Sequence, residues 1–216
     1  MKRKMFFYFG AWSLLAFSLW TFLLRYVDTK PIGPNRSVVG FATLNEFVHN
    51  LTGVNMTLYN ITDWLGLVPV FIAFGFALLG LFQWIKRRKI TKVDYSILAL
   101  GGFYIAVIGV YLLFERVVIN YRPVLINGFL EVSYPSSTTL LVMCVMPTAL
   151  MQFNDRIKNK ALKQVLSAII LLFIAFMVIG RIVSGVHGIT DIIGGALLST
   201  GLVMMYCWAI GLKKKR

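Results

Sequence analysis

Arg181-Ile-Val-Ser-Gly-Val-His187-Gly-Ile-Thr-Asp191 is a short polar stretch between two long apolar runs, 164–180 and 192–212. Charged side chains at a membrane boundary are costly to desolvate, so this concentration of them indicates a function. If the chain is helical from His187 onward, His187 and Asp191 lie on one face of that helix. Asp191 then accepts a hydrogen bond from one imidazole nitrogen, and the other nitrogen is free to act as a nucleophile or base. Arg181 adds a fixed cation suited to a phosphate oxygen.

The composition is that of a membrane protein. The chain has 216 residues, of which 58% are hydrophobic, and this places it far outside the range of soluble domains. The length suits one helical bundle, and we treat 1–216 as a single membrane-embedded domain. Cys144 and Cys207 both lie inside apolar runs, so we expect no disulfide framework.

Apolar windows recur along the whole chain, and each is close to the roughly 17–25 residues that a spanning helix needs. They fall at about 5–24, 64–85, 95–114, 136–153, 164–180 and 192–212. The windows are hydrophobic on all sides, which argues against amphipathic surface helices. The first window lacks a small-residue cleavage site and is interpreted as a retained helix. We therefore expect an all-α, polytopic protein with six transmembrane helices.

The positive charge is distributed according to this topology. Sixteen of the 22 Lys and Arg residues fall on one side of a six-span arrangement: Lys2, Arg3, Lys4, Lys86, Arg87, Arg88, Lys89, Lys92, Arg156, Lys158, Lys160, Lys163, Lys213, Lys214, Lys215 and Arg216. The positive-inside bias makes that side cytoplasmic and places both termini there. The net charge of +14 is thus a topology signal, and we expect anionic lipid headgroups rather than nucleic acid as its partners.

One long connection, about 25–63, lies on the opposite, outer side. Its start is broken by Pro31, Gly33 and Pro34. The stretch 38–59 mixes apolar and polar residues, which is compatible with a partial helix on the membrane surface. The connection either covers a functional site, as long loops often do, or simply packs on the bundle, and both interpretations remain open.

Three polar clusters fall at the outer ends of the expected spans: 115–123, 134–139 and 181–191. Each also has a purely structural explanation. Arg122-Pro123 suits a helix stop, Pro135-Ser136-Ser137 suits a helix cap, and His187 with Asp191 suits a structural pair. A helix start nevertheless presents free backbone N–H groups that bind phosphate. Because hydropathy and charge independently bring all three clusters to one end of the bundle, we expect them to form one site.

Taken together, these residues resemble the type-2 phosphatidic acid phosphatase superfamily, which shares its site with the vanadium haloperoxidases. The family pattern is Lys-x6-Arg-Pro, then Pro-Ser-Gly-His, then Ser-Arg-x5-His-x3-Asp. Arg181, His187 and Asp191 match the third motif in spacing. Arg122-Pro123 and Pro135-Ser136 are less specific but come in the expected order.

The resemblance implies hydrolysis of a phosphate ester without a metal cofactor. It assigns His187 as the nucleophile that forms a phosphohistidine and Asp191 as the residue that orients the imidazole. It also implies that Arg122, Arg181 and the backbone near Ser136 and Ser137 hold the phosphoryl oxygens. Arg116 and Thr138 are further candidates for phosphate contact.

The chain departs from the family pattern at three positions. Glu115 stands where the family has Lys, and it would share a face with Arg122 if the segment were helical. Gly180 replaces the usual Ser. Thr138 replaces the His that serves as general acid for the leaving group, and a hydroxyl of this kind is no useful acid near neutral pH.

The loss of that acid leads to a hypothesis about the substrate. General acid help is worth about 10²–10⁴-fold, and a phosphate leaving from a lipid diphosphate needs it far less than an alkoxide does. We therefore expect a lipid phosphatase that favours a polyprenyl diphosphate, acting at the outer face of a bacterial plasma membrane. The alternatives are a catalytically weakened lipid-phosphate binder and a phosphotransferase that uses an alcohol acceptor.

Overall fold

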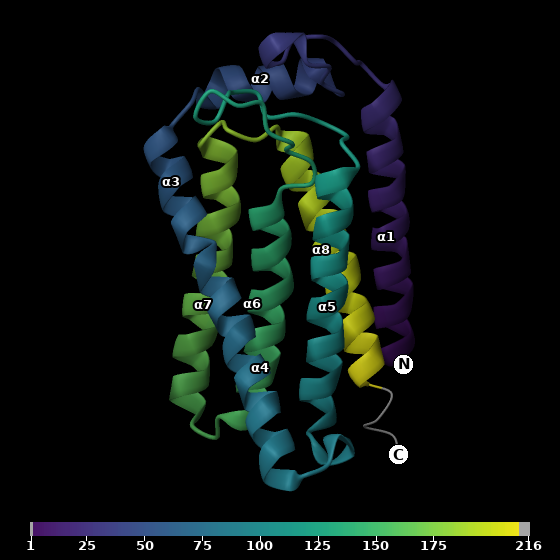
Figure 1. Ribbon diagram of the computed structural model, residues 1–216, viewed down its shortest axis with the longest axis vertical. Helices are drawn as coiled ribbons and strands as arrows, with labels where there is room; N and C mark the ends of the chain where they lie inside the picture. Colours follow the sequence, from purple (N-terminus) through teal and green to yellow (C-terminus); the bar gives the residue numbers. More distant parts are fainter. Residues whose placement is uncertain (1, 212–216) are drawn as a thin grey trace.

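The computed structural model describes residues 2–211 and is a bundle of long helices that is covered at one end (Figure 1). The long helices are α1 (Lys2–Tyr26), α4 (Leu67–Arg87), α5 (Tyr95–Arg116), α6 (Ser137–Arg156), α7 (Lys160–Val183) and α8 (Ile189–Ile210). The shorter elements are η1 (Pro34–Arg36), α2 (Ala42–Thr52), α3 (Met56–Leu65) and η2 (Ile90–Lys92). Over residues 2–211 only isolated β-bridges accompany these helices, so the expected all-α class is confirmed.

The expected apolar windows each coincide with one long helix, although the helices extend further at most ends. Helical segments long and apolar enough to cross a membrane are Arg3–Tyr26, Met56–Arg87, Tyr95–Arg116, Lys160–Val183 and Ile189–Ile210, which makes five within the described part of the chain. The second of these joins α3 to α4. An integral membrane protein is thus supported, while a sixth span through α6 stays a prediction.

Helix α6 differs from the other long helices because it is polar and enclosed. It contacts α4, α5, α7 and α8, and Figure 1 shows it running between them. Thr148 and Gln152 are buried in it, and the Gln152 side chain donates to the Tyr206 hydroxyl of α8 at 2.8 Å. A helix shielded by its neighbours can carry such groups, because protein rather than lipid satisfies them.

Helices α1 and α8 pack closely along their length. A Cβ added at Gly201 would lie 2.7 Å from the Leu14 side chain, and one at Gly10 would lie 3.2 Å from the Gly201 carbonyl oxygen. The Ser13 hydroxyl donates to the Leu197 carbonyl at 2.8 Å. Small residues therefore set the separation of these two helices, as is common between membrane helices.

The connection 25–63 is more helical than expected, because it contains α2 and most of α3. The Asn55 side chain caps α3 by accepting from the Leu58 N–H at 2.9 Å. Helix α2 lies across the end of the bundle, where the buried Asn45 amide donates to the Thr190 hydroxyl of α8 at 3.0 Å. Both helices are thus fixed to the bundle rather than free above it.

The second connection at this end, 117–136, folds back on itself like a hairpin. The Arg122 N–H donates to the Glu131 carbonyl, and the Ser133 N–H donates to the Asn120 carbonyl, each at 3.0 Å. The buried Asn120 amide oxygen also accepts from the Gly40 N–H at 3.1 Å, which ties the hairpin to the chain before α2. The covered end is therefore held together by buried polar contacts.

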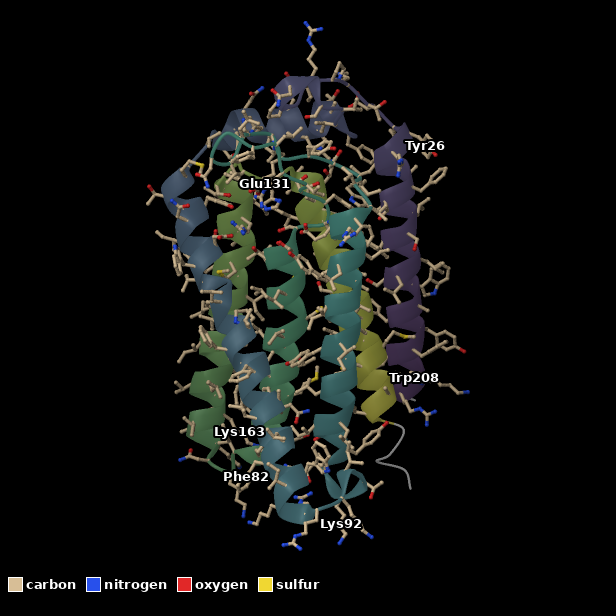
Figure 2. The ribbon with its side chains drawn as sticks, in the orientation of Figure 1. Tyr26, Phe82, Lys92, Glu131, Lys163 and Trp208 are labelled. Carbon is tan, nitrogen blue, oxygen red and sulfur yellow. The ribbon has the colours of Figure 1, made fainter. Side chains whose placement is uncertain are left out.

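The opposite end of the bundle carries the basic connections. Figure 1 shows that α1 begins there and α8 ends there, and Figure 2 shows Lys92 and Lys163 at this end. The expected cations Lys213, Lys214, Lys215 and Arg216 lie outside the described residues. Which side of a membrane this end faces stays a prediction from the positive-inside bias.

The α1–α8 contact gives a direct test of the packing. Gly201→Leu should lower the free energy of unfolding by about 1–3 kcal/mol, since it forces a side chain into the space held by Leu14. Gly109→Leu on α5 is the matched control, because a Cβ there meets nothing within 4 Å. Thermal unfolding of both variants in detergent measures the difference. Equal midpoints would contradict the close packing.

Candidate active site

A cavity of about 550 Å³ lies under the covered end of the bundle. It is enclosed by α3, the 117–136 hairpin, the end of α5, the start of α6 and the turn between α7 and α8. Its lining residues are Tyr59, Asp63, Tyr111, Phe114, Glu115, Arg122, Glu131, Val132, Ser133, Tyr134, Pro135, Ser137, Leu140 and His187. Members of all three polar clusters therefore meet in one place.

His187 lies in the turn before α8, so the condition that the chain is helical from His187 onward is not met. Gly185 in this turn has φ +65°, and a Cβ there would lie 1.7 Å from the Gly53 carbonyl oxygen, so the turn requires glycine. Gly188 is the N-cap of α8, and its N–H donates to Asp191 Oδ2 at 3.0 Å. Asp191 thus caps the helix while lying beside His187.

The contacts of His187 define its tautomer. Its Nε2 lies 3.0 Å from Nη1 of Arg122. A guanidinium can only donate, so Nε2 accepts and the ring proton is on Nδ1. The Nδ1 atom faces Asp191 Oδ2 at 3.9 Å, which is too long for the direct hydrogen bond that we expected. The imidazole is therefore neutral, with its Nε2 lone pair turned to Arg122.

Burial lowers the pKa of His187 to about 4, and the neighbouring Asp191 only partly opposes that effect. Arg122 and Arg181 lower this pKa further because they repel a second positive charge. An imidazole with this pKa is unprotonated at neutral pH. It is thus available as a nucleophile without first losing a proton.

Arg122 is buried and is held in place from three directions. Its Nε pairs with Glu131 Oε2 at 2.9 Å, and its Nη1 contacts His187. The guanidinium carbon also lies 5.5 Å from the centre of the Tyr59 ring. The expected cation from the 115–123 cluster is therefore placed directly beside the imidazole.

Arg181 is almost completely buried, with 1% of its surface exposed. Its Nη2 pairs with Asp63 Oδ1 at 2.8 Å and also donates to the Thr138 hydroxyl. Its guanidinium carbon lies 4.9 Å from the Tyr59 ring centre. We expected Arg181 to contact phosphate directly, but Asp63 and Tyr59 stand between it and the cavity, so its charge acts from one layer behind the wall.

The start of α6 supplies backbone donors. Ser136 is fully buried and caps the helix, its hydroxyl accepts from the Thr139 hydroxyl at 3.0 Å, and its own N–H donates to the Asp191 carbonyl at 3.0 Å. The Ser136 N–H is therefore already engaged, and Ser136 is not among the residues that line the cavity. Ser137 lines the cavity, and the first N–H groups of any helix lack an intrahelical acceptor.

Of the two neighbouring residues Glu115 and Arg116, the one that lines the cavity is Glu115 and not the expected Arg116. Arg116 is exposed at the end of α5 and is not among the residues that line the cavity. Glu115 does line it. Helix α5 ends at Arg116, so Glu115 and Arg122 do not share a helix face as we considered, although both reach the same cavity.

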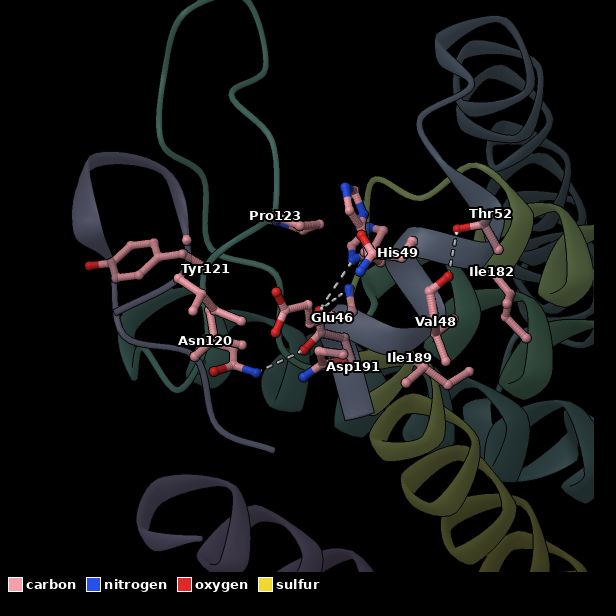
Figure 3. Close-up of a pocket in the computed structure, with 17 residues that line it drawn as sticks. Glu46, Val48, His49, Thr52, Asn120, Tyr121, Pro123, Ile182, Ile189 and Asp191 are labelled. Atoms are coloured by element: carbon pink, nitrogen blue, oxygen red, sulfur yellow. Dashed lines mark hydrogen bonds and ion pairs between the residues drawn. The ribbon is translucent and has the colours of Figure 1, made fainter. Parts of the chain in front are cut away.

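Beyond His187, a second cavity of about 210 Å³ lies beneath α2. Figure 3 shows Glu46 and His49 of α2 on it, together with Asn120 and Asp191. The Asn120 amide donates to Asp191 Oδ1 at 3.5 Å. His187 lines this cavity as well as the larger one, so it forms part of the wall between them.

At the opposite side the larger cavity continues into an apolar groove between α4 and α5. A pocket of about 480 Å³ shares Asp63, Tyr111, Ser137 and Leu140 with the cavity. A further apolar pocket of about 670 Å³ extends to Trp84. It shares Val70, Ala73, Tyr104 and Ile108 with the pocket of 480 Å³. A polar chamber thus opens into a long apolar track.

Sequence reasoning missed Tyr59, Asp63 and Glu131. Tyr59 and Asp63 are four residues apart and share a face of α3, a signal that the mixed composition of 38–59 did not reveal. Glu131 reaches Arg122 only because the hairpin folds back. Each of these contacts depends on tertiary structure that no local pattern encodes.

Comparison with known proteins finds one matching family model and one similar solved structure. The PAP2 superfamily model matches residues 118–215, which contain the hairpin and α6 to α8. The fold is similar to a transmembrane PAP2-type phosphatidylglycerolphosphate phosphatase from Bacillus subtilis, with a TM-score of 0.67 and 16% identity over 96% of this chain and 97% of that chain. No curated protein matches. The resemblance to this superfamily is confirmed for the part of the chain that contains α6 to α8.

The depressed pKa of His187 predicts how stability depends on pH. As pH falls from about 6.5 to about 4, the unfolded chain takes up a proton that the buried imidazole refuses, so the folded state loses about 2–3 kcal/mol. His187→Gln should lack this loss. His49→Gln, which removes the chain's other histidine, should retain it. The test is the unfolding midpoint of each variant measured across this pH range. If the midpoints of wild type and His187→Gln fall in parallel, the loss of stability does not come from His187.

Proposed function

We propose that this protein hydrolyses a lipid phosphate through a phosphohistidine on His187. The observation that carries the proposal is a neutral imidazole whose Nε2 faces Arg122 at 3.0 Å beside a polar cavity that opens into an apolar groove. A nucleophile, a cation and a route for an acyl or prenyl chain are thus adjacent. In this proposal the headgroup occupies the cavity and the chain lies along α4 and α5.

The chemistry follows from the placement of charge. As Nε2 attacks phosphorus, Arg122 transfers its hydrogen bond to a phosphoryl oxygen, and the imidazole becomes positively charged. Asp191 at 3.9 Å from Nδ1 stabilises that new charge. The start of α6 and the buried Arg181 add positive potential to the same wall. Phosphoryl transfer gains most from such preorganised electrostatics, so the proposal includes no metal cofactor.

The substrate preference is inferred from Thr138. Its hydroxyl accepts from Arg181, and Thr138 lines the apolar groove rather than the headgroup cavity, so it supplies no acidic proton. The absence of a general acid slows the reaction little when the leaving group departs as a phosphate. We therefore favour a polyprenyl diphosphate, while the relative from Bacillus subtilis makes phosphatidylglycerophosphate the first comparison.

Location is part of the proposal. The cavity lies at the end of the bundle opposite the basic connections, so the positive-inside bias directs it to the outer face of a bacterial plasma membrane. The cytoplasmic cations would then contact anionic headgroups of the inner leaflet.

A lipid-phosphate binder without turnover is the second candidate, and one observation favours it. Asp63, Glu115 and Glu131 all line the cavity, and their carboxylates repel a phosphate. The Glu131 and Asp63 side chains are 42% and 55% exposed, so neither is enclosed by protein. For turnover, a phosphate must bind in spite of repulsion from these three carboxylates or must displace their side chains.

The test is a phosphate-release panel on the purified protein in detergent with EDTA present. We expect release from a polyprenyl diphosphate to exceed release from phosphatidic acid and phosphatidylglycerophosphate by at least about tenfold, since the missing acid penalises alkoxide departure. His187→Ala should abolish release while retaining lipid binding.

Each alternative result has a clear meaning. Equal or faster release from phosphatidic acid would remove the diphosphate preference. Binding without release by the wild-type protein would establish the binder. Loss of activity in EDTA that added metal restores would overturn the metal-free chemistry.

A further inference from the structure

Asp63 lies where the headgroup cavity meets the apolar groove. It lines both spaces, together with Ser137, whereas His187 lines the cavity and the second cavity beyond it. The two residues therefore mark opposite ends of the chamber. A lipid phosphate with its chain in the groove places its leaving oxygen at the Asp63 end when its phosphorus faces His187.

The carboxylate of Asp63 is oriented as a base would be. Oδ1 is held by Arg181 Nη2 at 2.8 Å, and no residue among 2–211 donates to Oδ2. Asp63 is 55% exposed, so protein does not enclose its free oxygen. One fixed oxygen and one free oxygen give a defined direction for proton transfer.

Two departures from the family pattern make this arrangement possible. A Cβ at Gly180 would lie 2.7 Å from Cγ2 of Thr62, so glycine there lets α3 approach α7 closely. Thr138 accepts a hydrogen bond from the same Arg181 nitrogen that holds Asp63. The carboxylate therefore lies beside the position at which the family has its acid–base His.

We propose that Asp63 is the general base that activates water for hydrolysis of the phosphohistidine. This role rests on the proposed function, because it acts on the intermediate that His187 forms. In-line displacement brings water to the face that the leaving group has just vacated, which is the Asp63 end of the chamber.

The step balances as follows. The water oxygen donates an electron pair to phosphorus, and one water proton moves to Asp63 Oδ2. The bond between phosphorus and Nε2 breaks, and its electron pair returns to Nε2 as the lone pair. Inorganic phosphate leaves, and Asp63 loses its proton to solvent. An ionised Asp63 gives no help to leaving-group departure, which agrees with a preference for a diphosphate.

Other titratable groups nearby fit the role less well. Glu131 pairs with Arg122, which itself contacts Nε2, so Glu131 lies on the nucleophile side of the phosphorus. Glu115 lines the cavity but not the groove. His49 lines only the cavity beneath α2, beyond the imidazole. Of these groups, Asp63 alone adjoins the groove.

The experiment uses the full chain in detergent and farnesyl diphosphate radiolabelled at its terminal phosphate. Asp63→Asn should release the first product in a burst equal to the enzyme concentration. Phosphate release should then proceed about 10²–10⁴-fold more slowly than in wild type, with acid-labile label accumulating on the protein. Hydroxylamine, a nucleophile that needs no base, should restore turnover. Asp63→Glu should recover part of the rate.

Glu131→Gln is the matched control, because it also removes a carboxylate from a site arginine. It should change KM without accumulation of label. Asp94→Asn removes a comparable pair, with Arg87 at 2.8 Å, at the far end of the bundle and should behave as wild type. Unfolding midpoints confirm that each variant is folded.

The outcomes separate the two proposals. If Asp63→Asn slows the burst itself and accumulates no label, Asp63 only positions Arg181 and the base role is overturned. Faster turnover of Asp63→Asn would show that the carboxylate merely competes with phosphate, and this also overturns the role. If rapid quenching of wild type and of every variant yields no label on His187 although phosphate is released, the phosphohistidine itself fails.

Discussion

The hydrogen bond between Arg122 Nη1 and His187 Nε2, 3.0 Å long, is the contact on which the site depends. Because arginine only donates, this bond fixes the neutral tautomer and aims the lone pair at the place where phosphate would be held. It also joins the 117–136 hairpin to the turn before α8. Glu131 and Tyr59 hold the guanidinium from other sides, so the contact with Nε2 is fixed by three separate segments.

Much of this arrangement could be predicted from sequence, because the requirements that a bilayer sets for a helix apply to each short stretch of chain separately. A spanning helix needs a long apolar run, and each expected window coincides with a long helix, although α6 falls short of the apolarity of a span. Polar residues at a membrane edge are exceptional, so Arg122, Arg181 and His187 could be identified without a structure. Their convergence followed from counting spans, since the ends of alternate helices meet on one side.

What could not be predicted depends on contacts between distant segments. Asp63 reaches Arg181 across 118 positions of sequence, through a helix that hydropathy did not resolve. His187 lies in the turn before α8 while Asp191 accepts from the Gly188 N–H, and spacing alone does not distinguish a capping carboxylate from a charge partner. Arg181 was expected at the surface of the cavity, but its burial depends on the unforeseen α3.

The composition of α6 has a consequence for how the protein is made. A segment with buried threonine and glutamine gains little from hydrocarbon by itself, and among the long helices it is the one that falls short of the apolarity expected of an independent span. Its favourable surroundings exist only once the neighbouring helices are present. The cavity that Ser137 and Leu140 of α6 line therefore forms only when the whole bundle has assembled around this helix.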